Sequence, residues 1–149
     1  MALKSNFKKD LEKEKKLSSL LDSYYTTKLK HYTFKRITDL NQQYQGVDLI
    51  FEHKKKAISY SIDEKAQLDY INENLPTFAF EISYKKDGII KGGWLFDKTK
   101  KTQFYSLITS IYSDTPSIYY SCKITLVNRN KLINFLKKEA SLKSSYLKP

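Results

Sequence analysis

The chain has 149 residues and a formal net charge of +11 at pH 7, and hydrophobic residues make up 40% of it. This apolar content argues against a disordered chain, and the length fits a single domain over 1–149. The only cysteine, Cys122, excludes an internal disulfide framework and a multi-cysteine zinc site. The positive charge favours a polyanionic partner, with nucleic acid and an acidic membrane surface as the two alternatives.

Basic residues concentrate towards the two ends of the chain. Residues 1–36 contain ten Lys or Arg against four Asp or Glu, 121–149 contain seven against one, and 37–120 contain ten against eleven. This pattern is expected of a cation site framed by phosphate-binding surface, and a solvated basic exterior is the alternative. Because the N-terminus lacks a signal-peptide core and no apolar run approaches a membrane span, we expect a cytoplasmic protein that does not enter a membrane.

Apolar spacing predicts an amphipathic helix over 6–25 and, after a polar connector, two strands over 47–53 and 57–66 that pair as a hairpin. Further strands are predicted over 77–84 and 89–96, with the turn signal KKDG between them. Helical spacing returns over 100–112, a strand is predicted over 117–128, and a helix over 130–142 closes the chain with Leu132, Ile133, Leu136 and Ala140 facing inward.

Charged residues gather where the second strand ends, in the stretch SIDEKAQLDY at 61–70. Because residues two apart share a face of a strand, Asp63 and Lys65 project together and Glu64 points to the other side. Asp48 begins the neighbouring strand, out of phase with the apolar residues around it, so hairpin pairing would bring it beside Asp63. The alternative is a solvent-facing hairpin end with paired surface charges.

Two converging carboxylates suit a hard divalent cation, because magnesium prefers oxygen ligands and keeps several waters for a substrate phosphate. Such an ion neutralises charge on a phosphodiester and lowers the pKa of a bound water. A nearby lysine can hold the attacking water or stabilise the phosphate. The residues therefore favour a phosphodiesterase centre built on Asp48, Asp63 and Lys65.

The sequences GVD at 46–48 and IDEKA at 62–66 resemble the paired motif of the PD-(D/E)XK nuclease superfamily, whose restriction-endonuclease-like fold is shared by Holliday junction resolvases. The predicted element order is similar to the αβββαβ core of that family. The resemblance implies an α+β (α/β/α) fold with a central mixed sheet flanked by helices. Gly46 and Val47 stand where the proline that gives the motif its name would be, as in many members.

The resemblance also implies roles for individual residues. Asp48 and Asp63 would bind Mg²⁺, for which Mn²⁺ can substitute, together with the main-chain carbonyl of Glu64. Lys65 would be the catalytic lysine, and Gln67 resembles an accessory polar residue that some members place after it. Members often add an acid from the first helix, for which Glu12, Glu14 and Asp22 are the candidates. Many members form homodimers.

These features predict a nuclease that hydrolyses nucleic-acid phosphodiester bonds, with DNA as the expected substrate. The alternatives are a catalytically inactive member and an unrelated basic nucleic-acid-binding module. Lys35 and Arg36 are candidates for phosphate contacts or for ordinary solvated residues. Glu81 is either a further site carboxylate or an exposed residue, and we expect Trp94 and Cys122 to pack in or near the core.

Overall fold

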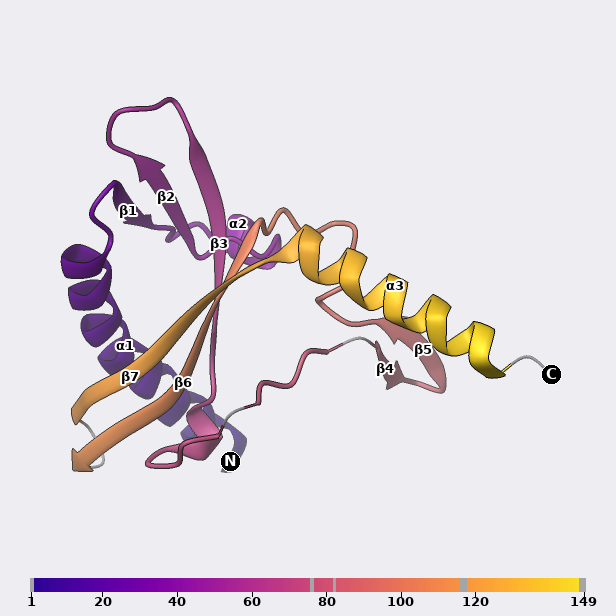
Figure 1. Ribbon diagram of the computed structural model, residues 1–149. Helices are drawn as coiled ribbons and strands as arrows, with labels where there is room; N and C mark the ends of the chain where they lie inside the picture. Colours follow the sequence, from indigo (N-terminus) through magenta and orange to yellow (C-terminus); the bar gives the residue numbers. More distant parts are fainter. Residues whose placement is uncertain (1, 76, 82, 116–117, 148–149) are drawn as a thin grey trace.

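The computed structural model of the protein describes residues 2–75, 77–81, 83–115 and 118–147. Strands β1, β2, β3, β6 and β7 form a five-stranded mixed sheet in that order, and β4 and β5 form a separate two-stranded sheet (Figure 1). The fold is therefore α+β. In chain order the elements are α1 (Ala2–Lys28), β1 (Tyr32–Arg36), α2 (Leu40–Tyr44), β2 (Leu49–His53), β3 (Ser59–Ala66), the 3₁₀ helix η1 (Leu68–Tyr70), β4 (Ser83–Lys86), β5 (Ile89–Gly92), β6 (Phe104–Thr115), β7 (Ile118–Asn128) and α3 (Arg129–Leu147).

Helix α1 covers one face of the five-stranded sheet. Its buried residues Leu17, Leu21 and Tyr25 recur every four positions, which places them on one side of the helix. They form one core with apolar side chains of β2, β3 and β6. The helix predicted over 6–25 is confirmed, and it extends further at both ends.

Strands β1, β2 and β3 are antiparallel neighbours. Leu49 of β2 lies opposite Arg36 of β1 on one side and opposite Ile62 of β3 on the other. The hairpin predicted from 47–53 and 57–66 is thus confirmed. Strand β1 was not predicted, and it makes β2 an interior strand. The predicted polar connector contains the short helix α2, whose first turn is capped by the Asp39 side chain.

The helix predicted over 100–112 is wrong, because Phe104–Thr115 is strand β6. It pairs parallel with β3 and antiparallel with β7, and residues 105–109 are buried in succession. An interior strand covered on both faces buries successive residues, so its apolar residues do not alternate and can also fall at helical spacing, as Phe104, Leu107 and Ile111 do. The connection from β3 to β6 contains η1 and the β4–β5 hairpin, so the second helix of the predicted αβββαβ order is not found among the described residues.

The strands predicted over 77–84 and 89–96 are confirmed only in part. Strand β4 begins at Ser83 and β5 ends at Gly92, while 77–81 and 93–96 are not strands; residue 82 lies outside the described residues. The predicted turn between them is present. Asp87 and Gly88 both have positive φ angles, 55° and 76°, as a tight two-residue hairpin turn requires.

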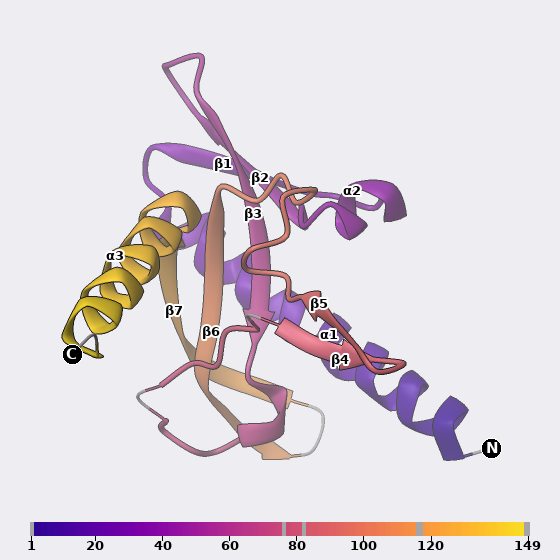
Figure 2. The same ribbon diagram turned by 90° about the vertical axis from the view of Figure 1, so that its right-hand side faces the viewer.

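Helix α3 and the segments 78–81 and 93–96 cover the opposite face of the sheet. There Leu95, Tyr105 and Leu107 are buried against aromatic residues of these segments and against Leu132, Ile133 and Leu136 of α3. The strand predicted over 117–128 is confirmed over Ile118–Asn128, with residue 117 outside the described residues, and the helix predicted over 130–142 is confirmed. Ala140 is exposed rather than inward, because the packing on the sheet involves the first turns of α3. Figures 1 and 2 show α1 and α3 on opposite sides of the sheet.

Candidate active site

Asp48 stands at the point where the chain enters the sheet as β2. The turn before it depends on Gly46, which is buried and has a φ angle of +78°, and the Thr102 hydroxyl donates to the Gly46 carbonyl at 2.6 Å. The Asp48 main chain forms hydrogen bonds on both sides. Its N–H donates to the Ile62 carbonyl of β3, and its carbonyl accepts from the N–H of Ile37, the residue after β1. The Asp48 carboxylate accepts the N–H of Glu64 at 2.9 Å. Asp48 is therefore held against β3.

Strand β3 separates its charged residues between the two faces of the sheet, as predicted. In the parallel register, Asp63 lies beside Tyr105 and Lys65 beside Leu107, two residues of the core under α3. The Lys65 ammonium is 3.4 Å from the Asp63 carboxylate. The Glu64 side chain lies on the α1 face and bonds there to Arg36 and Tyr25. The prediction that Asp63 and Lys65 project together, away from Glu64, is confirmed.

The Asp63 carboxyl group is unusual in its burial, because its side chain is only 9% exposed. Burial raises the pKa of Asp63 to about 7; nearby Lys65 lowers this pKa and the Asp48 carboxylate raises it. The two aspartates are thus close enough to repel each other, as the hairpin predicted. A cation bound between them would relieve this repulsion, so the pair fits a divalent metal ion electrostatically.

Lys65 has a second contact that the sequence did not predict. Its ammonium lies over the indole ring of Trp94, 4.6 Å from the ring centroid. Trp94 packs in the core under α3, as expected, in contact with Phe80 and Tyr105. The sequence analysis places Trp94 in or near the core and gives no signal for a contact with Lys65.

On the α1 face of the sheet, opposite to the face with Asp63, a polar network joins α1, β1, β3 and β6. The Arg36 guanidinium bonds to both oxygens of Glu64, at 2.7 and 3.3 Å, and to Asp22 at 2.5 Å. The Tyr25 hydroxyl donates to Glu64 at 2.8 Å and lies 2.7 Å from the Ser106 hydroxyl. Arg36, a candidate phosphate contact, is therefore engaged in internal ion pairs.

The other candidate residues have simpler surroundings. Gln67 donates from its side-chain amide to the Thr77 carbonyl at 2.6 Å, and its N–H bonds to Ile108, so it anchors the chain that leaves β3. Lys35 is exposed on β1. Glu81 is exposed, which agrees with the second of the two alternatives given for it, an exposed residue rather than a site carboxylate. Among the first-helix acids, Asp22 pairs with Arg36, while the side chains of Glu12 and Glu14 are outside the described part of the chain.

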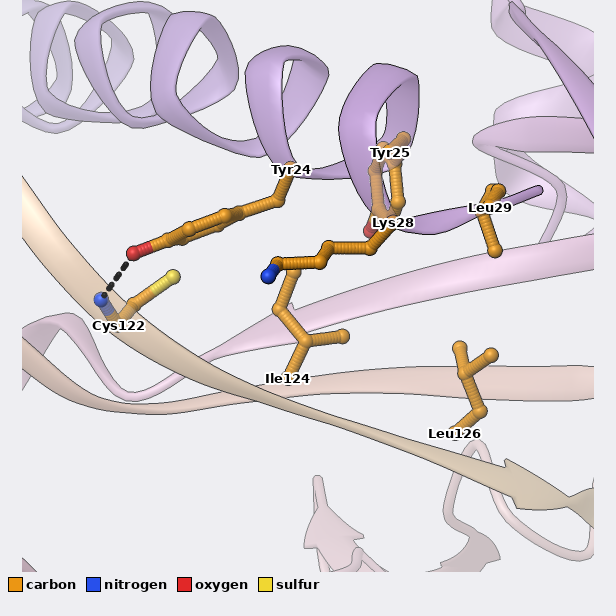
Figure 3. Close-up of a pocket in the computed structure, with 7 residues that line it drawn as sticks. All are labelled: Tyr24, Tyr25, Lys28, Leu29, Cys122, Ile124 and Leu126. Atoms are coloured by element: carbon orange, nitrogen blue, oxygen red, sulfur yellow. Dashed lines mark hydrogen bonds between the residues drawn. The ribbon is translucent and has the colours of Figure 1, made fainter.

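Two cavities lie beside α1. One, of about 560 Å³, is lined by Lys15, Arg36, Gln43, Asp48 and Glu64 together with apolar residues. The other, of about 320 Å³, is mainly apolar and lies between α1 and β7 (Figure 3). Its wall includes Cys122, whose N–H bonds to the Tyr24 hydroxyl. Burial raises the pKa of the Cys122 thiol to about 11, so this thiol is protonated at neutral pH and is a poor nucleophile.

Within the described residues, no group of three or more His, Cys, Asp or Glu side chains is placed to hold a metal ion. The set implied by the resemblance has two side chains, Asp48 and Asp63, and one main-chain carbonyl. No helix in the described part of the chain is long and apolar enough to cross a membrane. Comparison with protein-family models, with curated proteins and with solved structures finds no match for this chain.

Proposed function

We propose that the protein is a metal-dependent nuclease that hydrolyses phosphodiester bonds in nucleic acid, with DNA as the expected substrate. The observation that supports this function best is the meeting of Asp48, Asp63 and Lys65 from two paired strands, with Asp63 buried. A buried carboxyl group with a shifted pKa, beside specific charged partners, is more typical of a functional site than of a solvated surface.

The proposed fold is a variant of the restriction-endonuclease-like core. Apart from the short helix α2 between β1 and β2, the order α1, β1, β2, β3 and then β6, parallel to β3, fits the αβββ part and the last strand of the αβββαβ core. The β4–β5 hairpin and η1 occupy the connection in which that core has its second helix. The second part of the motif, 62–66, lies on β3, and the first part, 46–48, lies in the turn that leads into β2, the strand paired with β3.

In this proposal Asp48, Asp63 and the Glu64 carbonyl would hold Mg²⁺ or Mn²⁺. The ion, when bound, would activate a water and neutralise charge on the phosphate. Lys65 would present its ammonium to the attacking water or to the phosphate oxygens as a point charge. The exposed Lys35 and the basic ends of the chain would contact the nucleic-acid backbone.

The test is cleavage of labelled duplex, single-stranded and branched DNA and of RNA, with Mg²⁺, with Mn²⁺ and with a chelator. Asp63→Asn and Lys65→Met are compared with wild type. Asp69→Asn and Lys98→Met make the same chemical changes at exposed positions and serve as matched controls. We expect metal-dependent cutting that falls at least a hundredfold in the two site variants and is unchanged in the controls.

The alternative functions predict different outcomes. An inactive member or an unrelated basic module would bind nucleic acid in a salt-dependent way and cut none of the substrates. Binding that is unaffected by metal and by Asp63→Asn, together with no cleavage, would overturn the nuclease proposal. Cleavage that survives both Asp63→Asn and Lys65→Met would show that the activity belongs to another site or to a contaminant.

A further inference from the structure

The Lys65 ammonium is held by two partners of different chemistry. It lies 3.4 Å from the Asp63 carboxylate and 4.6 Å from the centroid of the Trp94 ring. The carboxylate attracts the ammonium by charge, whereas the indole attracts it through the negative face of its π-system. Because Asp63 is also a proposed metal ligand, a bound cation would weaken the first contact. The second contact would persist.

Trp94 is itself fixed in place by a set of close contacts. Its ring packs on Phe80 and Tyr105, with centroid separations of 5.4 and 5.1 Å. The Tyr105 hydroxyl in turn accepts a hydrogen bond from Arg129 at 3.1 Å. The main chain next to Trp94 is held as well, because the Leu95 N–H donates to the Glu81 carbonyl at 3.2 Å. The indole is therefore a rigid surface for the lysine.

The residue before Trp94 allows this close approach. Gly93 is buried, and a Cβ atom at this position would overlap the Glu81 carbonyl group. Only glycine lets the two segments lie so close without a shift of the backbone. The position of Trp94 thus depends on contacts of Gly93 and Leu95 with Glu81, which do not involve Asp63 or Lys65.

We propose that Trp94 is a positioning residue, whose indole face holds the Lys65 ammonium at the catalytic centre while Asp63 binds the metal ion. This inference rests on the proposed nuclease function. A lysine side chain has many rotamers. Each rotamer that places the ammonium outside the site lowers the fraction of enzyme molecules that can react. Loss of the indole should therefore reduce kcat, and KM should change little because the proposed role of Trp94 acts on the lysine rather than on substrate binding.

The first test compares Trp94→Leu with Trp94→Phe. Leucine keeps an apolar side chain but has no aromatic ring. Phenylalanine keeps an aromatic ring, whose face attracts a cation less strongly than an indole does. We expect kcat to fall about 5- to 30-fold in Trp94→Leu, with partial rescue in Trp94→Phe. Phe78→Leu is the matched control, because Phe78 packs on Phe80 in the same cluster. The proposal predicts near wild-type kcat for this control.

A double variant separates positioning from a general loss of packing. In a Lys65→Met background the indole has no ammonium to hold, so adding Trp94→Leu should not lower the residual rate further. An equal loss from Trp94→Leu in both backgrounds, or a loss confined to KM, would overturn the proposed role. These rates are compared only for variants with wild-type circular dichroism, and Trp94→Phe serves where Trp94→Leu fails to fold.

A measurement without substrate distinguishes failure of this inference from failure of the nuclease proposal. The indole ring current should shift the NMR signals of the Lys65 ε-methylene protons upfield, and Trp94→Leu should remove that shift while Phe78→Leu keeps it. Unshifted signals in the wild type would overturn the contact itself. Shifted signals in a wild type that cuts no substrate would instead overturn the nuclease, and with it the catalytic purpose of the contact.

Discussion

Asp63 shows at the scale of one residue how a functional group reduces stability. Its pKa rises from an ordinary value of 3.8 to about 7 on folding, mainly through burial. The folded protein therefore binds a proton that the unfolded chain has already released between these two pH values. The stability that Asp63 contributes is complete below about pH 4 and is lost as the pH rises through 7.

We therefore predict that Asp63→Asn, which is neutral at every pH, stabilises the metal-free protein more at pH 8 than at pH 5. One pKa unit corresponds to about 1.4 kcal/mol, so the gain at pH 8 should be on the order of 2 to 4 kcal/mol. The measurement is the free energy of unfolding by urea at both pH values, with a chelator present. Asp69→Asn, at an exposed position, should show no such difference. A stabilisation that is equal at both pH values would contradict the assigned burial.

At the scale of elements, the connection between α2 and β2 places Asp48. Gly46 has a positive φ angle, and a Cβ atom there would overlap the Thr102 hydroxyl and approach Asp63. Gly88, at the β4–β5 turn, has nearly the same φ angle, 76° against 78°, but no neighbouring atom within 4 Å of such a Cβ. The two glycines thus have the same backbone requirement and differ in the space around them.

We predict that Gly46→Ala lowers the free energy of unfolding by about 2 to 4 kcal/mol, because steric overlap adds to backbone strain. Gly88→Ala should cost about 1 kcal/mol, from strain alone. Urea unfolding of both variants gives the comparison, and Gly46→Ala should also impair cleavage because Asp48 must move. Equal losses in the two variants would mean that the contact with Thr102 relaxes freely.

The elements also show why the sequence predicted some features and missed others. The hairpin of β2 and β3 was predictable because its residues alternate with period two, and this alternation also placed Asp63 and Lys65 on one face. Strand β6 was mistaken for a helix because it is buried on both faces and has no alternation. Strand β1 was missed because its five residues include Lys35 and Arg36, which indicate phosphate contacts or solvated residues just ahead of the polar connector.

The candidate site was predictable only where it depends on local geometry. Asp48 and Asp63 meet through the pairing of adjacent strands, which follows from their spacing. Trp94 reaches Lys65 from a segment that packs on the sheet from outside it, and Arg36 of β1 reaches Glu64 of β3 across the intervening strand β2. Contacts of this kind depend on the packing of distant elements, for which a single sequence has no periodic signal.

At the scale of the whole molecule, the charge distribution predicts how nucleic acid binds. The basic ends of the chain include α1 and α3, which flank the sheet on opposite sides (Figure 1). The central part from 37 to 120 is nearly neutral, although it contains the exposed lysines of the β2–β3 turn. If the ends contact phosphates, lysines on α3 should matter more for binding than equally exposed lysines in the centre.

We predict that Lys137→Glu with Lys138→Glu on α3 weakens binding of duplex DNA more than Lys54→Glu with Lys55→Glu in the β2–β3 turn. Both double variants make the same charge change at exposed positions. Each lost phosphate contact should reduce the slope of log K against log salt concentration by about 1. The slope for the α3 variant should therefore be smaller than that of the wild type by up to about 2. Fluorescence anisotropy across a salt series, with a chelator to prevent cleavage, gives these slopes. A steeper loss in the turn variant would place the binding surface on the β2–β3 hairpin, because counterion release follows the lysines that contact phosphate.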